Sequence, residues 1–233
     1  MGLLFAPHPQ FRARVDTIGR DRAPVLVIDQ FCADAEGLVA AAEGAFGQGR
    51  RDRASFPGIV SPGDQGFARG AVAHLMPMLC KVFGVSGRIE TGGFDFQLMT
   101  SVPDDLSPRQ KRPHIDVSDL NVVASVLFLC RPPYQGTAFY RHNETGFEVI
   151  SPDRAKAYEA VQIELDARNS DSGYMNGDTD DFTEIARYDA AFNRLILFSA
   201  ASLHSGTATA DQGFSDDPRR GRLTANLFLK FAG

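Results

Sequence analysis

Two histidines and one aspartate stand in this sequence at spacings that suit a metal site. His114 and Asp116 are separated by a single residue, and His204 follows 88 positions after Asp116. In an extended strand, residues two positions apart point to the same side, so His114 and Asp116 would project together while Ile115 packs behind them. Two imidazoles and one carboxylate can bind a divalent iron on one face and leave the opposite face open. The pattern therefore indicates oxidative chemistry with molecular oxygen.

A segment near the C-terminus predicts a strand with one polar face. Arg222, Thr224 and Asn226 alternate with apolar residues, so these three side chains would share one side of the strand. Burying a charged arginine without a partner is costly. We therefore expect an anion beside Arg222, which is either a carboxylate of the protein itself or the carboxylate of a bound ligand.

Each of these signals also has a simpler interpretation. A histidine and an aspartate two positions apart occur by chance on surface strands, and a short motif alone is weak grounds for a site. His204 follows the predicted core strand 193–198, so it could be a hydrogen-bonded histidine of the core. The metal-site hypothesis gains weight because the three residues and Arg222 all fall within or beside predicted strands.

Length and composition limit the class of protein. The 233 residues are 43% hydrophobic, which is enough for the core of one large β-domain, and we expect a single domain spanning residues 1–233. No run approaches the roughly 18 apolar residues of a membrane-spanning helix. The first residues lack the basic and then apolar pattern of a secretory signal. We therefore expect a cytoplasmic protein that does not bind a membrane.

Charge and cysteine content exclude two further classes. The net charge is −5 and the basic residues are scattered, so nucleic acid is not an expected partner. The three cysteines contain no Cys-x-x-Cys pair, which argues against a disulfide framework and against a thiolate zinc site. We expect buried, reduced thiols.

The hydrophobic pattern changes from helical to strand-like along the chain. Residues 1–91 contain one apolar run typical of a strand (24–31), a helix starting at Asp34, a loop over 55–63 and a second helix over 67–83. Short strands follow, predicted over 93–100, 113–117, 121–130, 137–140, 147–150, 182–186, 195–199 and 223–231, with one helix over 153–167 capped by Ser151. Helices followed by strands predict a mainly β, α+β fold: a β-sandwich supported by a helical region over 1–91.

With these elements in place, the chain resembles the iron(II)- and 2-oxoglutarate-dependent dioxygenase superfamily, close to its prolyl-hydroxylase-like group. Further segments resemble an uncharacterised bacterial family within that superfamily. They are Leu106-Ser107-Pro108 with Pro113-His114-Ile115-Asp116, Gly136 to His142, Asn193 to Ile196, and Gly221 to Asn226. The resemblance covers residues 92 to 231 and is loose before them.

The resemblance implies a double-stranded β-helix, also called a jelly roll or cupin-like fold, whose core spans 92–233 and packs on the N-terminal helices. It implies that His114, Asp116 and His204 bind Fe(II), and that O2 oxidises a substrate while 2-oxoglutarate is decarboxylated to succinate. Halogenating relatives replace the carboxylate ligand with a small residue, so Asp116 favours hydroxylation over halogenation.

The resemblance also implies a binding site for 2-oxoglutarate. Arg222 would bind the distal carboxylate with help from Thr224, and Gln97 is a further candidate contact. Arg219 or Arg220 could bind that carboxylate instead. Against them, only Arg222 is followed two positions later by a hydroxyl residue that could share the same carboxylate.

Other functions and the identity of the substrate stay open. A zinc-bound water on the same fold could perform hydrolysis, and a jelly roll could also bind a ligand without chemistry. The loops 101–112 and 169–181 should border the site, and His142 could lie at its rim. Gln110 and Arg112 could meet a polar substrate, although a solvated loop is the simpler interpretation. The substrate could be a small molecule or a peptide, and a homodimer is one open oligomeric state.

Overall fold

The computed structural model describes residues 4–49, 51–52, 56–168, 173–209 and 211–232, and these residues form two antiparallel sheets. The large sheet contains β1 (Arg12–Ile18), β2 (Ala23–Asp29), β3 (Arg51–Asp52), β4 (Gly58–Pro62), β5 (Ile89–Met99), β6 (Val122–Phe128), β9 (Arg194–Ser199) and β11 (Arg222–Phe231). The small sheet contains β7 (Thr137–His142), β8 (Phe182–Tyr188) and β10 (His204–Gly206). The strand orders are β1-β2-β9-β6-β11-β5-β4-β3 and β10-β7-β8.

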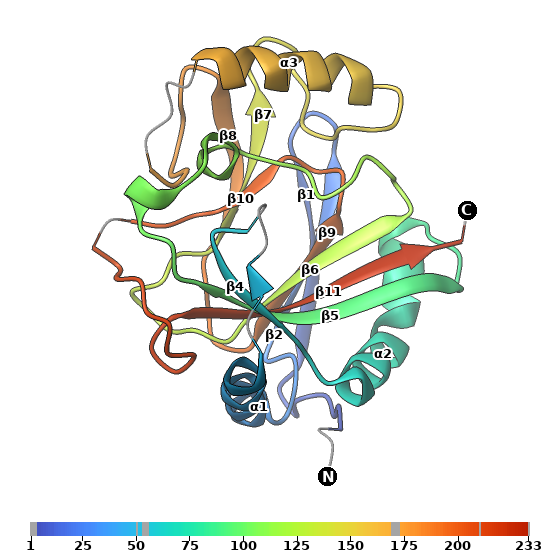
Figure 1. The fold of residues 1–233 in the computed structure, drawn as a ribbon. Helices are drawn as coiled ribbons and strands as arrows, with labels where there is room; N and C mark the ends of the chain where they lie inside the picture. Colours follow the sequence, from blue (N-terminus) through green and yellow to red (C-terminus); the bar gives the residue numbers. More distant parts are fainter. Residues whose placement is uncertain (1–3, 50, 53–55, 169–172, 210, 233) are drawn as a thin grey trace.

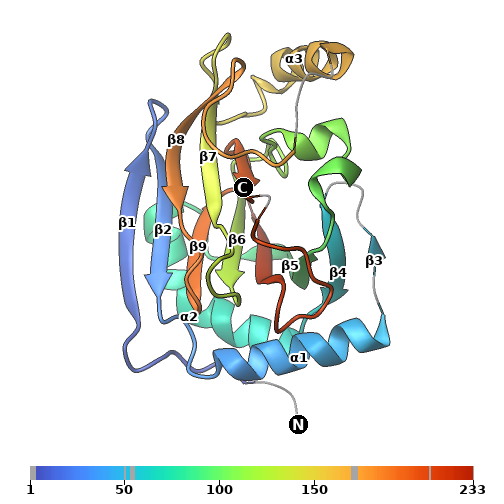
Figure 2. The same ribbon diagram turned by 90° about the vertical axis from the view of Figure 1, so that its left-hand side faces the viewer.

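In the described part of the chain, three α-helices cover the outer faces of the sheets. They are α1 (Ala35–Gln48), α2 (Gln65–Phe83) and α3 (Ala155–Arg168), and two 3-10 turns, η1 (Pro103–Asp105) and η2 (Pro108–Lys111), lie between β5 and β6. Figures 1 and 2 show α1 and α2 at one end of the molecule, beside the large sheet, and α3 at the opposite end beyond the small sheet. Asp34 caps α1 as predicted, because its side chain accepts a hydrogen bond from the Gly37 N–H at 2.8 Å. None of the described helices is both long and apolar enough to cross a membrane.

Strand alternation divides the core into layers. In β2, Leu26 and Ile28 pack against the N-terminal helices, whereas Val25 and Val27 face the space between the two sheets. The other side of the small sheet packs under α3, where Tyr158 contacts a cluster that includes Phe182. The result is a double-stranded β-helix packed on N-terminal helices, so the predicted fold class is confirmed.

Several boundaries differ from the sequence prediction. Residues 1–91 are not only helical, because they contribute β1 to β4 to the large sheet, and β4 lies within the predicted loop 55–63, whose first residue is outside the described part of the chain. The predicted strands 113–117 and 147–150 reduce to isolated bridges, His114 with His204 and Val149 with Ser202. The helix predicted from 153 begins at Ala155, after a turn. The conformation of the two bridged segments depends on residues far away in the sequence, and their own hydrophobic pattern shows little strand periodicity.

The burial of the three cysteines agrees broadly with the prediction of buried, reduced thiols. Cys32 and Cys130 are buried and Cys80 is half-buried, and all three are free. Burial raises the pKa of the Cys32 thiol to about 12, so this side chain stays protonated at neutral pH.

One buried asparagine holds the start of the strand that leads to His204. Asn193 accepts a hydrogen bond from the Cys32 N–H at 3.0 Å and donates to the Cys32 carbonyl at 2.8 Å. Its own N–H donates to the Phe128 carbonyl at 2.8 Å, and its φ of 65° lies in the left-handed region. Asparagine tolerates that backbone conformation better than most residues. Asn193 therefore joins the segment that follows β2 to β6 and to the start of β9.

We expect Asn193→Ala to lower the free energy of unfolding by about 2–4 kcal/mol, because it removes two buried hydrogen bonds and places an ill-suited residue at positive φ. Asn193→Gly should lose less, since glycine adopts this conformation without strain. Urea denaturation of the three proteins measures both values. Equal stability of the alanine and glycine variants would contradict the backbone part of this account.

Candidate metal centre

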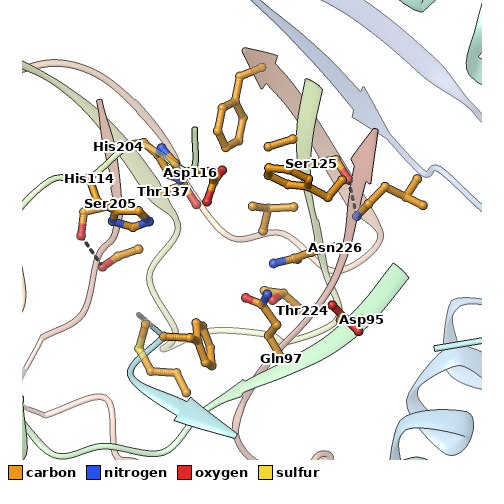
Figure 3. A pocket seen from close by; sticks show the side chains of 18 of the residues that line it. Asp95, Gln97, His114, Asp116, Ser125, Thr137, His204, Ser205, Thr224 and Asn226 are labelled. Atoms are coloured by element: carbon orange, nitrogen blue, oxygen red, sulfur yellow. Dashed lines mark hydrogen bonds and ion pairs between the residues drawn. The ribbon is translucent and has the colours of Figure 1, made fainter. Parts of the chain in front are cut away.

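A cavity of about 610 Å³ lies between the two sheets, lined by side chains from both of them and from the segment that follows η2. Figure 3 shows His114, Asp116 and His204 on one side of this cavity, with Asp95, Gln97, Thr224 and Asn226 across from them. Two groups of polar residues, one from the small sheet and its neighbouring segment and one from the large sheet, therefore face a common space.

Backbone hydrogen bonds position His114 and Asp116, although neither residue lies in a regular strand. His114 and His204 form an antiparallel bridge in which each N–H donates to the other residue's carbonyl at 2.9 Å. The Asp116 N–H donates to the Ala200 carbonyl, also at 2.9 Å. These bonds fix the backbone at residues 114 and 116, and the two side chains emerge towards the same space. The projection expected from the His-x-Asp spacing is thus achieved by the bridge of His114 to β10 and the bond of Asp116 to Ala200.

The three side chains converge. One ligand atom from each of His114, Asp116 and His204 lies within 4.8 Å of the other two. The His204 Nε2 and Asp116 Oδ2 atoms are 3.8 Å apart, and the two imidazole centroids are 4.5 Å apart. His204 Nδ1 lies 2.9 Å from the Ser202 carbonyl, a pure acceptor, so Nδ1 carries the proton and the Nε2 lone pair is left for a metal. The donor set fits a divalent transition metal.

The arginine predicted to need an anion is buried without one. Arg222 is 4% exposed, and it donates from Nε to the Gln135 carbonyl at 2.8 Å and from Nη2 to the Gly136 carbonyl at 2.6 Å. Its guanidinium lies 5.7 Å from the centre of the Phe128 ring. Within the described part of the chain, no carboxylate pairs with it, and burial lowers its pKa. Neutral carbonyls satisfy two donors but leave the charge uncompensated.

Arg219 and Arg220 do not line the cavity. Arg219 forms two hydrogen bonds with Glu43 of α1, at 2.7 and 2.6 Å. The Arg220 side chain is 82% exposed and lies 3.6 Å from Asp217. Of the three candidates, Arg222 is the one that lines the cavity.

Thr224 and Gln97 are neighbours across two paired strands. They face each other in the register of β11 and β5, and both line the cavity. Gly206 of β10 approaches from the opposite sheet, where an added Cβ would lie 3.5 Å from Arg222 Nη2. A Cβ at position 206 would therefore be in ordinary van der Waals contact with the guanidinium.

Other predicted candidates lie outside this group. His142 is buried beneath α3, bonded through Nδ1 to the Thr145 hydroxyl at 2.9 Å, and it does not line the cavity. Arg112 is 1% exposed and forms an ion pair with Asp166 of α3, so the expected solvated loop is wrong for this residue. Gln110 does line the cavity.

Of the two loops expected to border the site, 101–112 contributes Gln110 to the cavity lining, and the described residues of 169–181 contribute none, although the two loops contact each other. Tyr174 donates a hydrogen bond to the Ser101 carbonyl at 2.7 Å and stacks on Phe214. Residues 169–172 of the second loop lie outside the described residues. Asp95 and Thr137 also line the cavity but were not predicted. Asp95 could have been found, because it alternates with Gln97 on the predicted strand 93–100.

Comparison with known proteins finds one matching family and several solved structures of similar fold. A family described as "Family of unknown function (DUF6445)" matches residues 9–229. None of the curated protein sequences matches the chain. Among solved structures, the non-heme alpha-ketoglutarate-dependent carbocyclase SnoK from nogalamycin biosynthesis is similar, with a TM-score of 0.54 and 11% identity over 89% of this chain and 79% of that one.

A second similar structure is HygX from Streptomyces hygroscopicus, crystallised with nickel, 2-oxoglutarate and hygromycin B. Its TM-score is 0.47 and its identity 13%, over 91% of this chain and 84% of that one. The likeness to SnoK shows that this chain has the fold of a non-haem 2-oxoglutarate-dependent enzyme. The resemblance read from the sequence is confirmed at the level of the fold.

The environment of His114 makes the metal-free protein sensitive to acid. Burial, helped by the nearby His204, lowers the pKa of His114 to about 4, against an opposing effect of Asp116. In the unfolded chain the same group titrates near 6.5, so the unfolded state binds more protons between these pH values. Stability should be unaffected above pH 6.5, fall as the pH drops to about 4, and level off below it.

We expect this loss to be at most about 3 kcal/mol, since the ring keeps some solvent contact. Urea denaturation in EDTA at pH 7.5 and at pH 4.5 measures it. His114→Gln should show a smaller difference between the two pH values, because the variant has no imidazole to protonate. An equal pH dependence in both proteins would rule out His114 as its source.

Proposed function

This chain belongs to the DUF6445 family, and from that premise and the geometry of its cavity we propose that it is an Fe(II)- and 2-oxoglutarate-dependent dioxygenase that hydroxylates its substrate. The observation that carries the proposal is that one cavity contains both the His-Asp-His group and a buried guanidinium with no carboxylate partner in the described part of the chain. The first group suits a metal and the second suits an acidic co-substrate. The match of one family to residues 9–229 supports a single oxygenase domain.

His114, Asp116 and His204 would hold the iron. When bound, iron and 2-oxoglutarate together supply an oxidant from O2 that hydroxylates a C–H bond, while the co-substrate loses carbon dioxide and becomes succinate. The Ser202 carbonyl keeps the proton of His204 on Nδ1, so the ring presents Nε2 to the centre of the site. The Asp116 carboxylate adds a negative charge that partly compensates a divalent cation.

Arg222 and Thr224 would orient the co-substrate. A ligand carboxylate would restore charge balance to the buried guanidinium, whose position is fixed by the Gln135 and Gly136 carbonyls. The Thr224 hydroxyl makes no hydrogen bond to a described residue, so it is free to donate to the same carboxylate. The surrounding buried side chains limit access of water, which strengthens this ion pair.

The competing functions explain less of the cavity. A zinc hydrolase would use the His-Asp-His group but would leave Arg222 buried without a role. A binding module without chemistry would need neither the converging ligand atoms nor the fixed tautomer of His204. Zinc that co-purifies with the protein, together with no effect of 2-oxoglutarate on thermal stability, would favour hydrolysis. Ligand binding unchanged by EDTA would favour the binding module.

The first prediction of this proposal concerns the metal. Anaerobic protein mixed with Fe(II) and 2-oxoglutarate should develop a weak visible charge-transfer band, and His114→Ala should abolish it. Absorption spectroscopy measures the band, and circular dichroism checks that the variant keeps its fold. A wild-type protein that is folded and loaded with iron but shows no band would contradict the proposal.

The second prediction separates the three arginines. Arg222→Met should raise the KM for 2-oxoglutarate by about 100-fold or more, because a charge-assisted bidentate contact is worth roughly 3 kcal/mol. Arg220→Gln is the matched control and should leave that KM unchanged, since its side chain lies in solvent. Succinate formation measures both. A larger effect at Arg220 than at Arg222 would reverse the assignment.

A further inference from the structure

We propose that a second cavity, beside the metal centre, binds an acyl group of the substrate, and that the substrate is a small molecule with an apolar acyl chain. This cavity, called here the α3 groove, lies between α3 and residues 107–118, a segment that includes His114 and Asp116. The inference deepens the proposed function and rests on it. It is carried by the place of the groove, its apolar walls, and two buried polar atoms without hydrogen-bond partners.

The α3 groove adjoins the cavity that contains the His-Asp-His group. It has a volume of about 740 Å³, and Gln110, His114 and Ile115 line both cavities. Figure 2 shows the segment with η1 and η2, drawn in green, beside α3. A molecule in the α3 groove would therefore contact the same short segment that positions two of the three proposed metal ligands.

One face of α3 forms a wall of the groove. The residues of this face recur at alternate intervals of three and one positions, as expected for a single side of a helix. They are Ala155, Tyr158, Glu159, Gln162, Ile163 and Asp166. From 155 to 166 a helix rises by about 16 Å. The wall is therefore long enough for an extended chain to lie along it.

An ionic bridge joins the two walls at one end of the groove. Asp166 of α3 accepts a hydrogen bond from Arg109 at 2.8 Å through one carboxylate oxygen, and one from Arg112 through the other. Only Pro113 separates Arg112 from His114, so the bridge also restrains the segment that holds the proposed metal ligand. Because the bridge crosses the groove, it favours a small molecule over a polypeptide chain that continues beyond this end.

Apolar side chains line the groove on both sides. They are Pro108, Pro113, Ile115, Ile150, Ala155 and Ile163. Ile163 is 62% exposed, so a bound apolar chain would remove its surface from water. Each methylene group that becomes buried in this way strengthens binding by up to about 4-fold. The groove therefore suits a hydrocarbon chain.

Two buried polar atoms on α3 interrupt the apolar lining. The Tyr158 hydroxyl and Gln162 Nε2 make no hydrogen bond within the described part of the chain. Their side chains are neighbours one helical turn apart, but the geometry between them is not that of a hydrogen bond. Both atoms can donate, and one carbonyl oxygen has two lone pairs to accept from them. A carbonyl on an apolar chain, which is an acyl group, therefore matches both the polar atoms and the walls.

The test measures the binding of amides of increasing chain length to EDTA-treated protein by ligand-observed NMR. The probes are acetamide, butanamide, hexanamide and octanamide, with a blocked trileucine peptide for comparison. Affinity should rise about 2- to 4-fold with each added methylene, because each one adds apolar contact. Octanamide should bind more tightly than the peptide.

Two variants test the polar atoms. Tyr158→Phe and Gln162→Leu each remove one donor, so each should weaken octanamide binding about 3- to 10-fold and leave the dependence on chain length unchanged. Neither variant should lower the free energy of unfolding, because the deleted donors have no partner among the described residues. Urea denaturation checks this, and it separates a ligand-binding role from a structural one.

A matched pair of variants tests the apolar wall. Ile163→Glu places a charge in the groove and should flatten the dependence of affinity on chain length. Ala160→Glu adds the same group to an exposed position of the same helix, outside the groove lining, and should bind the probes as the wild-type protein does.

A second measurement links the α3 groove to the metal centre. In anaerobic protein loaded with Fe(II) and 2-oxoglutarate, octanamide should shift the charge-transfer band, because His114 lines both cavities. Tyr158→Phe should need about 3- to 10-fold more octanamide for the same shift.

Any of five results would overturn the inference: no binding of octanamide, affinity that does not rise with chain length, unchanged binding by both Tyr158→Phe and Gln162→Leu, tighter binding of the peptide, or octanamide binding that leaves the band unaltered. If the band itself forms normally in those cases, the proposed oxygenase function stands and only the inference about its substrate fails. If the band never forms in folded, iron-loaded protein, the oxygenase function fails, and the role of the groove in substrate binding fails with it.

Discussion

The pair of backbone hydrogen bonds between His114 and His204 is the interaction on which the site depends. It joins an irregular segment after η2 to the short strand β10, and it brings together residues that are far apart in the sequence. Neither histidine lies in a long strand with many hydrogen-bonded partners. The surrounding core must therefore hold both segments, which it does through the Asp116 bond to Ala200 on one side and the pairing of β10 with β7 on the other.

The second constraint is the burial of a charge. Arg222 is the first residue of β11. Its side chain faces the cavity, whereas the side chain of the next residue, Leu223, faces the helices. The guanidinium donates to two neutral carbonyl oxygens, from Gln135 and Gly136, and lies 5.7 Å from the centre of the Phe128 ring. Close approach at Gly136 is essential, because a Cβ there would lie 1.8 Å from the Tyr188 carbonyl. The geometry thus prepares a cation for an anion that the described residues do not supply.

The sequence predicted those parts of the fold whose signal is local. The period of two in 222–227 correctly assigned Arg222, Thr224 and Asn226 to one face, because the other face is uniformly apolar. Strand β1 was missed because all of its residues except Asp16 and Ile18 are exposed, so its sequence lacks the large apolar side chains that mark a buried strand. The segment 113–117 was predicted as a strand, yet its conformation depends on the bridge of His114 to His204, 90 residues away, and on the Asp116 bond to Ala200. The spacing of the arginines could not show that Arg219 pairs with α1.

The division of the His-Asp-His group between two distant segments has a consequence for the whole chain. A metal held by Asp116 and His204 would act as a non-covalent cross-link that closes a loop of 88 residues, which contains β6 to β9 and α3. Metal that binds only the folded state favours that state by an amount that grows with the logarithm of the free metal concentration, about 2.7 kcal/mol when the free metal is 100 times its Kd. Cofactor loading would then be part of how this fold is stabilised, and cellular metal supply would influence how much folded protein persists.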